Sequence, residues 1–561
     1  MSRLVGALLT AWLVSSGVSA QTPSSTPGFP APPRDNSALP PAPSTAIIRG
    51  HVYDASNGKP LRKVQVRAVS PELRENRLAI TDNNGAFEIR NLAAARYQLS
   101  AQKGSFVTLQ YGQTRPFEQG KPIDVHDAQV IDKVDFNLPH GAVVTGRVVD
   151  ETGEPQSNVQ VTLQRYQYIN GRRQLNTTSF ASTNDIGEYR LFGVAPGQYF
   201  VTATMRLFNF SDAPPDDRSG YAPTYYGGST NVNDAQRITL AVGQQLNDIN
   251  IGLAPTQLAR ITGTAVTSDG KPLTGGLVNL IQVLGQGSFF SSIGAQLKPD
   301  GSFSVGGVAP GDYILRGQSP LTAGALPEQI QASLTVNGQD ITDLRLVGVK
   351  PSSVSGRVVP PAGSQANLGE LMILTVPKVF LPLAGGNGNT RVNEDGTFDL
   401  KAQPGVVYLR LNAQGAFSTT RIRTVRLNGV DVTDSGFEIK PNEDLRGFEV
   451  ELTNQMASVV GSVSDARGNP ARDYTVLLFP RDRERWETTS RYLYVARPDQ
   501  EGKYKAQYVL PGSYYAIALD YLEQGSQGDP EFLDRIKERA TELTINDTET
   551  ASLDLKLTTA P

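Results

Sequence analysis

The sequence has no cysteine and only three histidines in 561 residues. An exported chain without cysteine forms no disulfide and cannot be a lipoprotein anchored through a cysteine. The histidines, His51, His126 and His140, stand in no HExxH or HxxE motif, so the ligands of a zinc peptidase are missing. We therefore predict no metal site built from histidine.

Other arrangements for catalysis are also missing. The chain has no Gly-x-Ser-x-Gly elbow and no Cys/His pair, which argues against nucleophilic catalysis. The adjacent acids Asp216 and Asp217 follow two prolines, a context typical of a solvated turn and not of an acid/base pair. The sequence predicts a protein that is not an enzyme.

An excess of charge and long apolar runs are lacking as well. The 52 basic and 55 acidic residues leave a net charge of -3, which favours neither nucleic acid nor an anionic membrane as partner. The first residues combine a basic Arg3, an apolar stretch and the small residues Val18-Ser19-Ala20, so residues 1–20 are predicted to be a signal peptide for export. No later stretch approaches the roughly 20 apolar residues of a spanning helix, and we expect no transmembrane segment in the mature chain.

What the chain does have is a long repeat. A phrase made of a Gly-x-Val opening, an Asp/Asn-Gly-x-aromatic turn and then Pro-Gly-x-Tyr recurs five times, with one or another part eroded in individual copies. A repeat of about 100 residues is the size of a domain and indicates an array of modules. Residues 21–45, rich in Pro, Ser and Ala, are predicted to be a tether. The five predicted modules are 46–140, 141–256, 257–349, 350–455 and 456–561.

The pattern inside each module predicts β-strands. In the second module Val159, Val161 and Leu163 alternate with polar residues, and Val64, Val66 and Ala68 take these positions in the first. Alternation places such side chains on one face, which must be buried against a second sheet. The predicted fold class is all-β, a tandem array of about five prealbumin-like or Ig-like β-sandwiches. The exception is a helix expected over 530–543 in the fifth module, after a capping Asp529.

Each part of the repeated phrase has a structural explanation. The Asp/Asn-Gly segments are predicted to turn hairpins. The Pro-Gly pairs suit a type II turn, because proline presets a negative φ and glycine supplies the positive one. They recur at Pro196-Gly197, Pro310-Gly311, Pro404-Gly405 and Pro511-Gly512. Since the modules follow one another within a few residues, we expect a semi-rigid chain of beads with small interfaces between neighbours.

The phrase GxVxDxxGxPxxxVxV, followed by D-G-x-[FY] or D-x-x-G-x-[FY] and PGxY, resembles the carboxypeptidase regulatory-like domain. The resemblance covers residues 46 to 558 and implies a prealbumin-like sandwich, while YAPTYYGGSTN and LNGVDVTD look like phrases of secreted bacterial members with several such modules. Domains of this family accompany peptidase and outer-membrane receptor domains and are classed with carbohydrate-binding-like folds. The resemblance therefore implies a fold without fixing an activity.

Two features of the sequence, an aromatic loop and a set of Asp-rich turns, could bind a ligand. Aromatic side chains that could stack on a sugar or a partner gather in one loop, with a weaker candidate in the fifth module, and these candidate ligand-binding residues are Tyr221, Tyr225, Tyr226 and Trp486. The Asp-rich turns could hold Ca²⁺, although Asn, Asp and Gly are also what a tight turn requires. We favour the turn and predict no cofactor.

The main hypothesis is a non-enzymatic exported scaffold that binds a protein or cell-envelope partner through several weak surfaces. Its compartment is expected to be the periplasm, the outside of the cell or the cell surface. One alternative is a carbohydrate-binding protein that retains polysaccharide. Another is an accessory subunit of an envelope peptidase or of an outer-membrane transport system.

Overall fold

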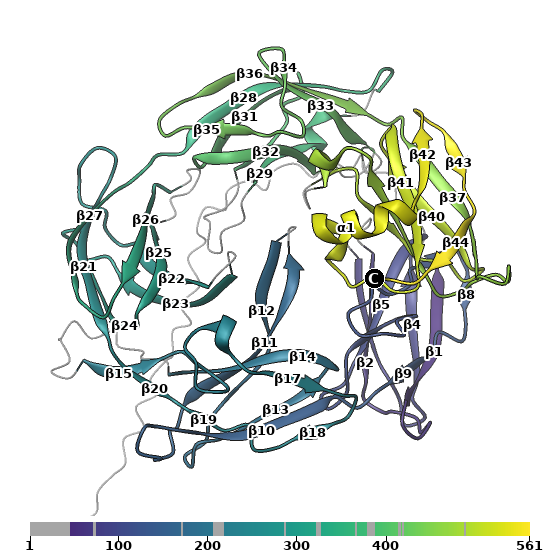
Figure 1. Cartoon of the computed structure of the whole chain (residues 1–561). Helices are drawn as coiled ribbons and strands as arrows, with labels where there is room; N and C mark the ends of the chain where they lie inside the picture. The colour runs from purple at the N-terminus through teal and green to yellow at the C-terminus, as the bar shows by residue number, and fades with distance from the viewer. Residues whose placement is uncertain are drawn as a thin grey trace, which may run out of the picture.

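The computed structural model describes residues 45–70, 75–169, 172–205, 218–284, 288–320, 327–364, 367–378, 388–412, 417, 420–486 and 490–561. These residues form an all-β protein of tandem sandwiches, which confirms the predicted fold class. The predicted signal peptide, nearly all of the tether, and Asp216 and Asp217 lie outside this part of the chain. The modules are arranged around a ring (Figure 1).

The first module consists of two sheets, of order β4-β1-β8 with β9 beside β1, and β3-β2-β5-β6 with β7 beside β5. Its strands are β1 (Ala46–Asp54), β2 (Gln65–Ser70), β3 (Glu75–Ile80), β4 (Ala86–Leu92), β5 (Ala95–Gln102), β6 (Leu109–Gln110), β7 (Ile123–Val125), β8 (Val130–Ile131) and β9 (Phe136–Leu138).

The second module repeats this plan, with sheets β13-β10-β18 and β12-β11-β14-β16. Its strands are β10 (Ala142–Val149), β11 (Val159–Ile169), β12 (Arg172–Ser182), β13 (Glu188–Val194), β14 (Gly197–Met205), β15 (Ser219–Ala222), β16 (Thr224–Tyr225), β17 (Arg237–Leu240), β18 (Gln245–Leu246), β19 (Ile251–Gly252) and β20 (Ala254–Gln257). The pair β15 and β20 leads into the third module.

The third and fourth modules keep the two-sheet plan. In each of them one longer closing strand pairs with the opening strand, where the first two modules have two short ones. The third contains β21 (Ala259–Val266), β22 (Leu277–Leu284), β23 (Ser288–Gln296), β24 (Ser302–Val308), β25 (Gly311–Gln318), β26 (Gln329–Val336) and β27 (Ile341–Val347). The fourth contains β28 (Ser352–Val359), β29 (Met372–Pro377), β30 (Asn389–Arg391), β31 (Thr397–Ala402), β32 (Gly405–Asn412), β33 (Arg421–Leu427), β34 (Val430–Asp431), β35 (Phe437–Ile439) and β36 (Leu445–Thr453).

The fifth module joins its two sheets, because β44 pairs with both β37 and β41. Its elements are β37 (Ala457–Ser464), β38 (Thr475–Pro480), β39 (Tyr494–Ala496), β40 (Lys503–Val509), β41 (Gly512–Leu519), the short helix α1 (Pro530–Ile536), β42 (Thr541–Ile545), β43 (Thr550–Ser552) and β44 (Leu555–Thr558).

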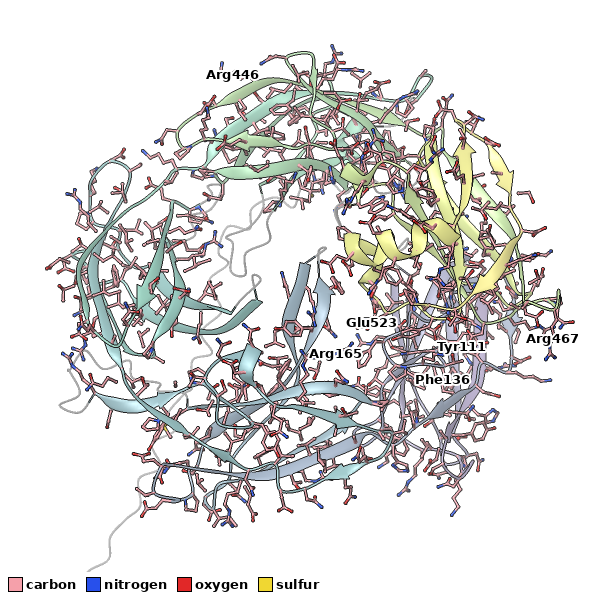
Figure 2. The ribbon with its side chains drawn as sticks, in the orientation of Figure 1. Tyr111, Phe136, Arg165, Arg446, Arg467 and Glu523 are labelled. Carbon is pink, nitrogen blue, oxygen red and sulfur yellow. The ribbon has the colours of Figure 1, made fainter. Side chains whose placement is uncertain are left out.

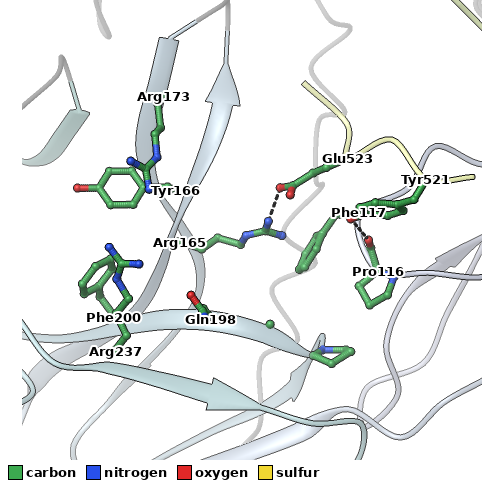
Figure 3. A pocket seen from close by; sticks show the side chains of 12 residues that line it. Pro116, Phe117, Arg165, Tyr166, Arg173, Gln198, Phe200, Arg237, Tyr521 and Glu523 are labelled. Atoms are coloured by element: carbon green, nitrogen blue, oxygen red, sulfur yellow. Dashed lines mark hydrogen bonds and ion pairs between the residues drawn. The ribbon is translucent and has the colours of Figure 1, made fainter. Parts of the chain in front are cut away.

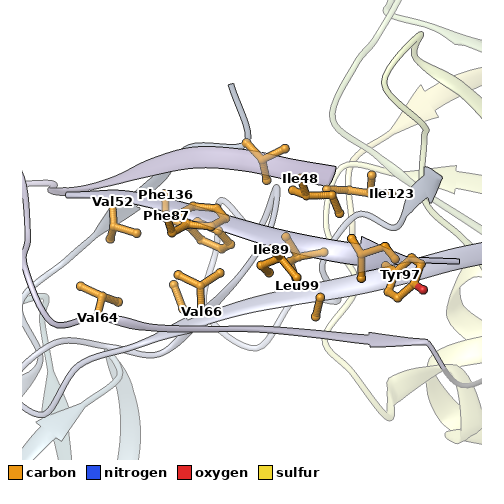
Figure 4. Packing of buried hydrophobic residues seen from close by; sticks show 14 of the residues in the cluster. Ile48, Val52, Val64, Val66, Phe87, Ile89, Tyr97, Leu99, Ile123 and Phe136 are labelled. Carbon is orange, nitrogen blue, oxygen red and sulfur yellow. The ribbon is translucent and has the colours of Figure 1, made fainter. Parts of the chain in front are cut away.

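Each module has its own core between its two sheets. In the first, Val64, Val66 and Ala68 are fully buried opposite Phe87 and Ile89 of the other sheet (Figure 4). The corresponding residues of the second module, Val159, Val161 and Leu163, are buried in the same way. The alternation therefore predicted the buried face correctly, because a strand side chain must point to one face or the other.

The glycine of the repeated Gly-x-Val has a cause that the sequence did not reveal. In every module the opening strand runs parallel to the closing strand, as β10 does with β19. At Gly146 a Cβ atom would lie 2.0 Å from the carbonyl oxygen of Ile249, and the equivalent glycines meet a closing-segment carbonyl at 1.9 to 2.2 Å. Only glycine allows the two backbones to approach this closely.

The predicted turns are placed correctly, but two of their assignments are wrong. The turn before Gly187 joins β12 to β13, which belong to different sheets, so it is a corner between sheets and not a hairpin. The Pro-Gly pairs do not form type II turns either. The φ angles of Gly197, Gly311, Gly405 and Gly512 are +156, +154, +134 and +156°, whereas a type II turn requires about +80°.

The tyrosine after Pro-Gly secures this corner. The hydroxyl of Tyr199 donates to the carbonyl of Ala195 at 2.8 Å, and Tyr313 and Tyr514 make the same bond four residues back, to Ala309 and Leu510. These rings are buried in the core, and the bond to the carbonyl satisfies the hydroxyl group that is buried with each ring.

The helix predicted over 530–543 is shorter than expected. Asp529 caps it as predicted, accepting from the backbone N–H of Glu531, but α1 ends at Ile536. A single 3₁₀ turn follows, and Thr541 begins β42, which pairs with β41. The strand takes precedence because the edge of β41 offers backbone hydrogen bonds to this segment. The helix covers the outer face of β38 and β41 and not one end of the sandwich, since its Phe532 and Leu533 pack there.

The modules do not form an open chain of beads. They follow a curved path, and the fifth module lies beside the first, so the array closes into a ring (Figure 1). Contacts such as the ion pair between Glu118 and Arg497, 379 residues apart, hold this closure. We call the contacts of residues 112–121 and of β11 with the fifth module the ring-closure joint.

Candidate functional site

The ring-closure joint centres on one buried arginine. Arg497, directly after β39, forms an ion pair with Glu118 of the first module, and both side chains are only 1% exposed. The Arg497 guanidinium also donates to Thr475 at 3.0 Å, to Asp473 at 2.9 Å and to the carbonyl of Gly112 at 3.4 Å. A buried charge is tolerated only when it is paired in this way.

A second set of polar contacts surrounds this pair. Thr114 donates to Asp473 at 2.8 Å, and Lys121 lies 3.3 Å from the same carboxylate. Burial on its own would raise the pKa of Asp473, but the hydrogen bond from Thr114 and the charges of Lys121 and Arg497 outweigh it and hold this pKa below its usual value. The carboxylate is therefore charged at neutral pH and contributes to closure.

Backbone contacts extend the joint along residues 115–118. The amide of Gln524 donates to the carbonyl of Phe117 at 2.9 Å, and Tyr521 donates to the carbonyl of Pro116 at 2.9 Å. Burial, and after it the charge of Glu523, raises the pKa of Tyr521 to about 12, so its hydroxyl stays a donor.

The second module enters the joint through its long strand β11. Arg165 pairs with Glu523 of the fifth module and stacks on the ring of Phe117 from the first, 3.3 Å from its centroid. Figure 2 shows Arg165 and Glu523 facing one another, whereas Arg446 and Arg467 lie on the outer rim. Three modules therefore meet at one arginine.

Gly525 permits the closest approach of β11 to the fifth module. Its φ is +98°, which disfavours other residues, and a Cβ there would lie 2.2 Å from the carbonyl oxygen of Tyr168. Beside it, burial and a hydrogen bond to Asp529 raise the pKa of Tyr168 to about 12.

A cavity of about 410 Å³ opens where the three modules meet (Figure 3). One wall comes from the second module, with Arg173 over the ring of Tyr166 and Arg237 over the ring of Phe200, at 4.2 and 5.1 Å from the ring centroids. The opposite wall comes from Pro116 and Phe117 of the first module and from Tyr521 and Glu523 of the fifth. Its size lies in the range of small-molecule sites.

The lining of this cavity consists mainly of arginine and aromatic residues. The described lining contains arginine, aromatic, proline, glycine, glutamine and one glutamate residue, with no serine, threonine or histidine among them. Nucleophilic catalysis needs a nucleophile beside a base. Arg165 and Glu523 are already paired with one another.

The structure places the predicted ligand-binding residues mainly in structural positions. Tyr225 is 1% exposed and packs edge-on against Phe200, and Trp486 is 2% exposed and donates to the carbonyl of Pro480. Neither ring presents a face that a sugar could stack on. Half-buried Tyr226 packs on the main core of its module, whereas Tyr225 belongs to a separate cluster on the outer face.

Tyr221, like Tyr226, is half-buried and packs on the main core of the second module. Its hydroxyl donates to Glu151 at 2.8 Å, and burial followed by this bond raises its pKa to about 12. It lies on β15, which pairs with β20, the strand directly before the third module. The three tyrosines are thus close in sequence but do not form one exposed surface, and ligand binding by any of them stays a prediction.

The Asp-rich turns use their side-chain oxygens internally. Asp82 accepts from the backbone N–H groups of Asn84 and Ala86, both at 2.8 Å, and Asp465 accepts similarly from Arg467 and Asn469. In the part of the chain that the structure describes, no group of three or more His, Asp or Glu side chains is arranged to hold a metal ion.

His51 and His140 each lie beside an aspartate. His140 lies 3.1 Å from the buried Asp54 at the joint of the first two modules, and His51 lies on β1 beside Asp135. Among the described residues, the search for a long apolar helix that could cross a membrane finds none.

Sequence reasoning missed the whole ring-closure joint. Arg165, Glu118 and Arg497 are ordinary charged residues in the sequence, and only Gly525 carries a signal, a glycine within a segment of otherwise unremarkable composition. The segment YGQTRPFEQGKPIDV, which contains Phe117 and Glu118, carries no signal of a contact with the fifth module.

The comparisons with known proteins concern the first two modules and the fold. The family model of the carboxypeptidase regulatory-like domain matches residues 47–139 and 143–254. No curated protein matches the chain.

Several solved structures match parts of this chain at low sequence identity. The Bacillus anthracis TIE protein is 12% identical over 69% of this chain and 67% of its own, with a TM-score of 0.15. A streptococcal ancillary pilin is 12% identical over 56% of this chain and 99% of its own, with a TM-score of 0.20. The major pilin subunit of Bacillus cereus is 10% identical over 54% and 99%, with a TM-score of 0.13. These likenesses support no inference about function.

Proposed function

Residues 47–139 and 143–254 are tandem carboxypeptidase regulatory-like domains, and from this premise we propose that the protein is a non-enzymatic exported scaffold that binds a protein or cell-envelope partner as a closed ring. The observation that carries the proposal is the ring-closure joint. It buries an ion pair between modules that are distant in sequence, Glu118 and Arg497.

Closure changes what a tandem array can do. An open chain presents its loops at variable distances, so each loop pays an entropic cost when it binds a common partner. A closed ring fixes the loops of the first, second and fifth modules relative to one another. The scaffold would therefore bind one partner with several modules at once.

The glycan-binding alternative loses two of its four residues as stacking surfaces, because Tyr225 and Trp486 are buried. A role as accessory subunit of an envelope peptidase or transport system differs from the proposal only in the identity of the partner.

The test is retention of envelope proteins and polysaccharides on the immobilised full chain, with ring-opening variants for comparison. Arg497→Ala and Glu118→Ala remove the buried pair from either side, and Arg423→Ala removes an exposed pair with Asp547 between the fourth and fifth modules. We expect a specific partner to be retained by the wild type and by Arg423→Ala, and to be lost from both ring-opening variants.

Two results would contradict the proposal. A partner retained equally by closed and opened rings would show that closure is not part of the binding form. Failure of the closed ring to retain any envelope component would remove the scaffold role itself. A retained peptidase or transporter would instead select the accessory-subunit alternative.

A further inference from the structure

The cavity at the ring-closure joint holds more positive than negative charge. Three arginines line it, Arg165, Arg173 and Arg237, and the one acidic residue in its lining is Glu523. Glu523 pairs with Arg165, which lies between the modules and is only 10% exposed. Arg165 also keeps one guanidinium nitrogen, Nη1, buried without a hydrogen-bond acceptor among the described residues. The single carboxylate therefore cannot balance the other two arginines.

Arg173 and Arg237 are the accessible cations of this cavity. Within the described ranges, neither guanidinium forms an ion pair with an acidic side chain, whereas Arg165 in the same cavity does. Each instead lies over an aromatic ring of its own module, Tyr166 or Phe200. Stacking holds the planar group in place and leaves its N–H edge free for an oxyanion.

The same stacking argues against a neutral sugar. A sugar ring would need an open aromatic face, but Arg173 and Arg237 each cover a face of these two rings. Phe117 is likewise covered by Arg165 (Figure 3). What the cavity offers a ligand is guanidinium, which prefers carboxylate or phosphate in bidentate geometry.

We infer that this cavity binds a small organic ligand with two oxyanionic groups, carboxylates or phosphates, one for Arg173 and one for Arg237. A volume of about 410 Å³ suits a small organic molecule. Two separate cations on one wall select for two anionic groups on one skeleton, because the second contact then forms within a single complex. This ligand class belongs to the ring-closure joint. The inference rests on one part of the proposed function, namely that the closed ring is the form that binds.

The first experiment varies the number of anionic groups on a six-carbon chain. Adipate, hexanoate and adipamide have similar carbon chains with two, one and no carboxylates, and binding of each to the full chain is measured by calorimetry. We expect adipate to bind about tenfold more tightly than hexanoate, and adipamide not at all. Equal binding of adipate and adipamide, or of adipate and hexanoate, would overturn the inference.

The two sources of oxyanion are separated in the same way. Succinate and suberate vary the span between carboxylates, and fructose bisphosphate and fructose monophosphate replace carboxylate by phosphate. A preference for the bisphosphate over every dicarboxylate identifies a phosphorylated ligand, and the reverse identifies a dicarboxylic acid. If inorganic phosphate binds as tightly as the best of these probes, the site recognises a lone anion and the organic ligand is excluded.

The second experiment uses variants of the two accessible arginines. Arg173→Gln and Arg237→Gln should each reduce the affinity for the best two-anion probe to that of its one-anion analogue. The double variant should also lose the contact of the second anionic group, and little else. The matched control is Arg190→Gln, an exposed arginine that lies 5.3 Å over Phe192 in the same module but away from the cavity. A loss in Arg190→Gln equal to that in the cavity variants would show that the effect is one of general charge.

Failure of this inference can be told apart from failure of the proposed function. Small-angle scattering on the same samples reports whether the ring is closed. A closed ring that binds no two-anion probe overturns the ligand and leaves the scaffold role standing. An open ring that binds none overturns both, whereas an open ring that binds the probe supports the ligand and contradicts closure.

Discussion

The joint between the fourth and fifth modules and the joint that closes the ring both use arginine–carboxylate pairs, and the most deeply buried pair lies at the closure. At the serial joint, Arg491 and Asp434 are 15% and 32% exposed. Arg423 and Asp547, between the fourth and fifth modules, are 46% and 43% exposed. Arg497 and Glu118 at the closure are 1% exposed each. Consecutive modules are held together by the chain, which keeps their effective concentration high. Modules separated by hundreds of residues have no such help, so closure depends on buried contacts.

Exposed and buried ion pairs between modules should differ in how much they stabilise the ring. Exposed pairs of the serial type contribute little, about 0–1 kcal/mol each. Breaking a buried pair leaves a charge without its partner and costs about 3–5 kcal/mol. The shape of the molecule should therefore respond to a few residues at the closure and hardly at all to exposed pairs such as Arg423 and Asp547.

The largest effect is expected from removal of Arg497. Arg497→Ala leaves Glu118 buried without its cation, and the ring should open, since opening returns Glu118 to water at a saving of about 3–5 kcal/mol. Scattering should show a larger radius of gyration than for the wild type. Glu118→Ala, which leaves the fifth module unaltered, should open the ring as well. Arg423→Ala should leave the radius unchanged, and a closed Arg497→Ala ring would remove the distinction between the two kinds of joint.

A smaller effect is expected from Gly525→Ala. The added Cβ would meet the carbonyl of Tyr168 at 2.2 Å, and overpacking of this kind costs about 1–3 kcal/mol. Gly468→Ala is the control, because its φ of +85° is similar but no atom lies within 4 Å of the added Cβ. Hydrogen exchange of residues 112–121 should rise only in the first variant. Equal changes in both would mean that backbone strain, and not contact with β11, explains the effect.

Acid should weaken the closure through Asp473. The folded-state pKa of this carboxyl is lowered, so its contribution is present above its ordinary pKa of about 3.9 and is lost as the pH falls through the folded value. Scattering between pH 7 and pH 3 should show opening at the acidic end. In Asp473→Asn the ring should be less stably closed at pH 7 and should change less on acidification. An unchanged pH dependence would exclude Asp473 as the titrating group.

The smallest effect is expected from salt. Raising the salt to about 1 M shortens the screening length to about 3 Å, which weakens exposed pairs more than buried ones. Exchange at the joint of Arg423 and Asp547 should therefore increase more than exchange around Glu118. If the ring opened in salt while the joints between consecutive modules stayed unchanged, the closure would be the more salt-sensitive joint, which is the opposite of the expected result.

The predictability of the fold follows the range of each interaction. Alternation at Val159, Val161 and Leu163 predicted their burial, because a strand has only two faces. The Pro-Gly corners were located correctly but given the wrong conformation, since glycine accepts several positive φ values. The helix end at Ile536 was missed because pairing of β42 with β41 outweighs local helical periodicity.

The candidate site was less predictable than the fold. An aromatic loop predicts either an exposed face or a packed edge, and the structure buries Tyr225 beside Phe200. The sequence could not identify the three arginines of the cavity, Arg165, Arg173 and Arg237, as binding residues. What distinguishes them is the shortage of carboxylates around this cavity. That shortage depends on Glu523, which is 358 residues from Arg165.

The sequence by itself determined the modules. The repeated phrase, with its strand alternation and corners, depends on contacts within about 100 residues, so each unit carries the information for its own sandwich. Only the tertiary structure decided that the modules close into a ring and that three arginines face one glutamate. Closure brings together residues hundreds of positions apart, and whether their charges are buried, paired or left in surplus depends on the geometry of three modules at once.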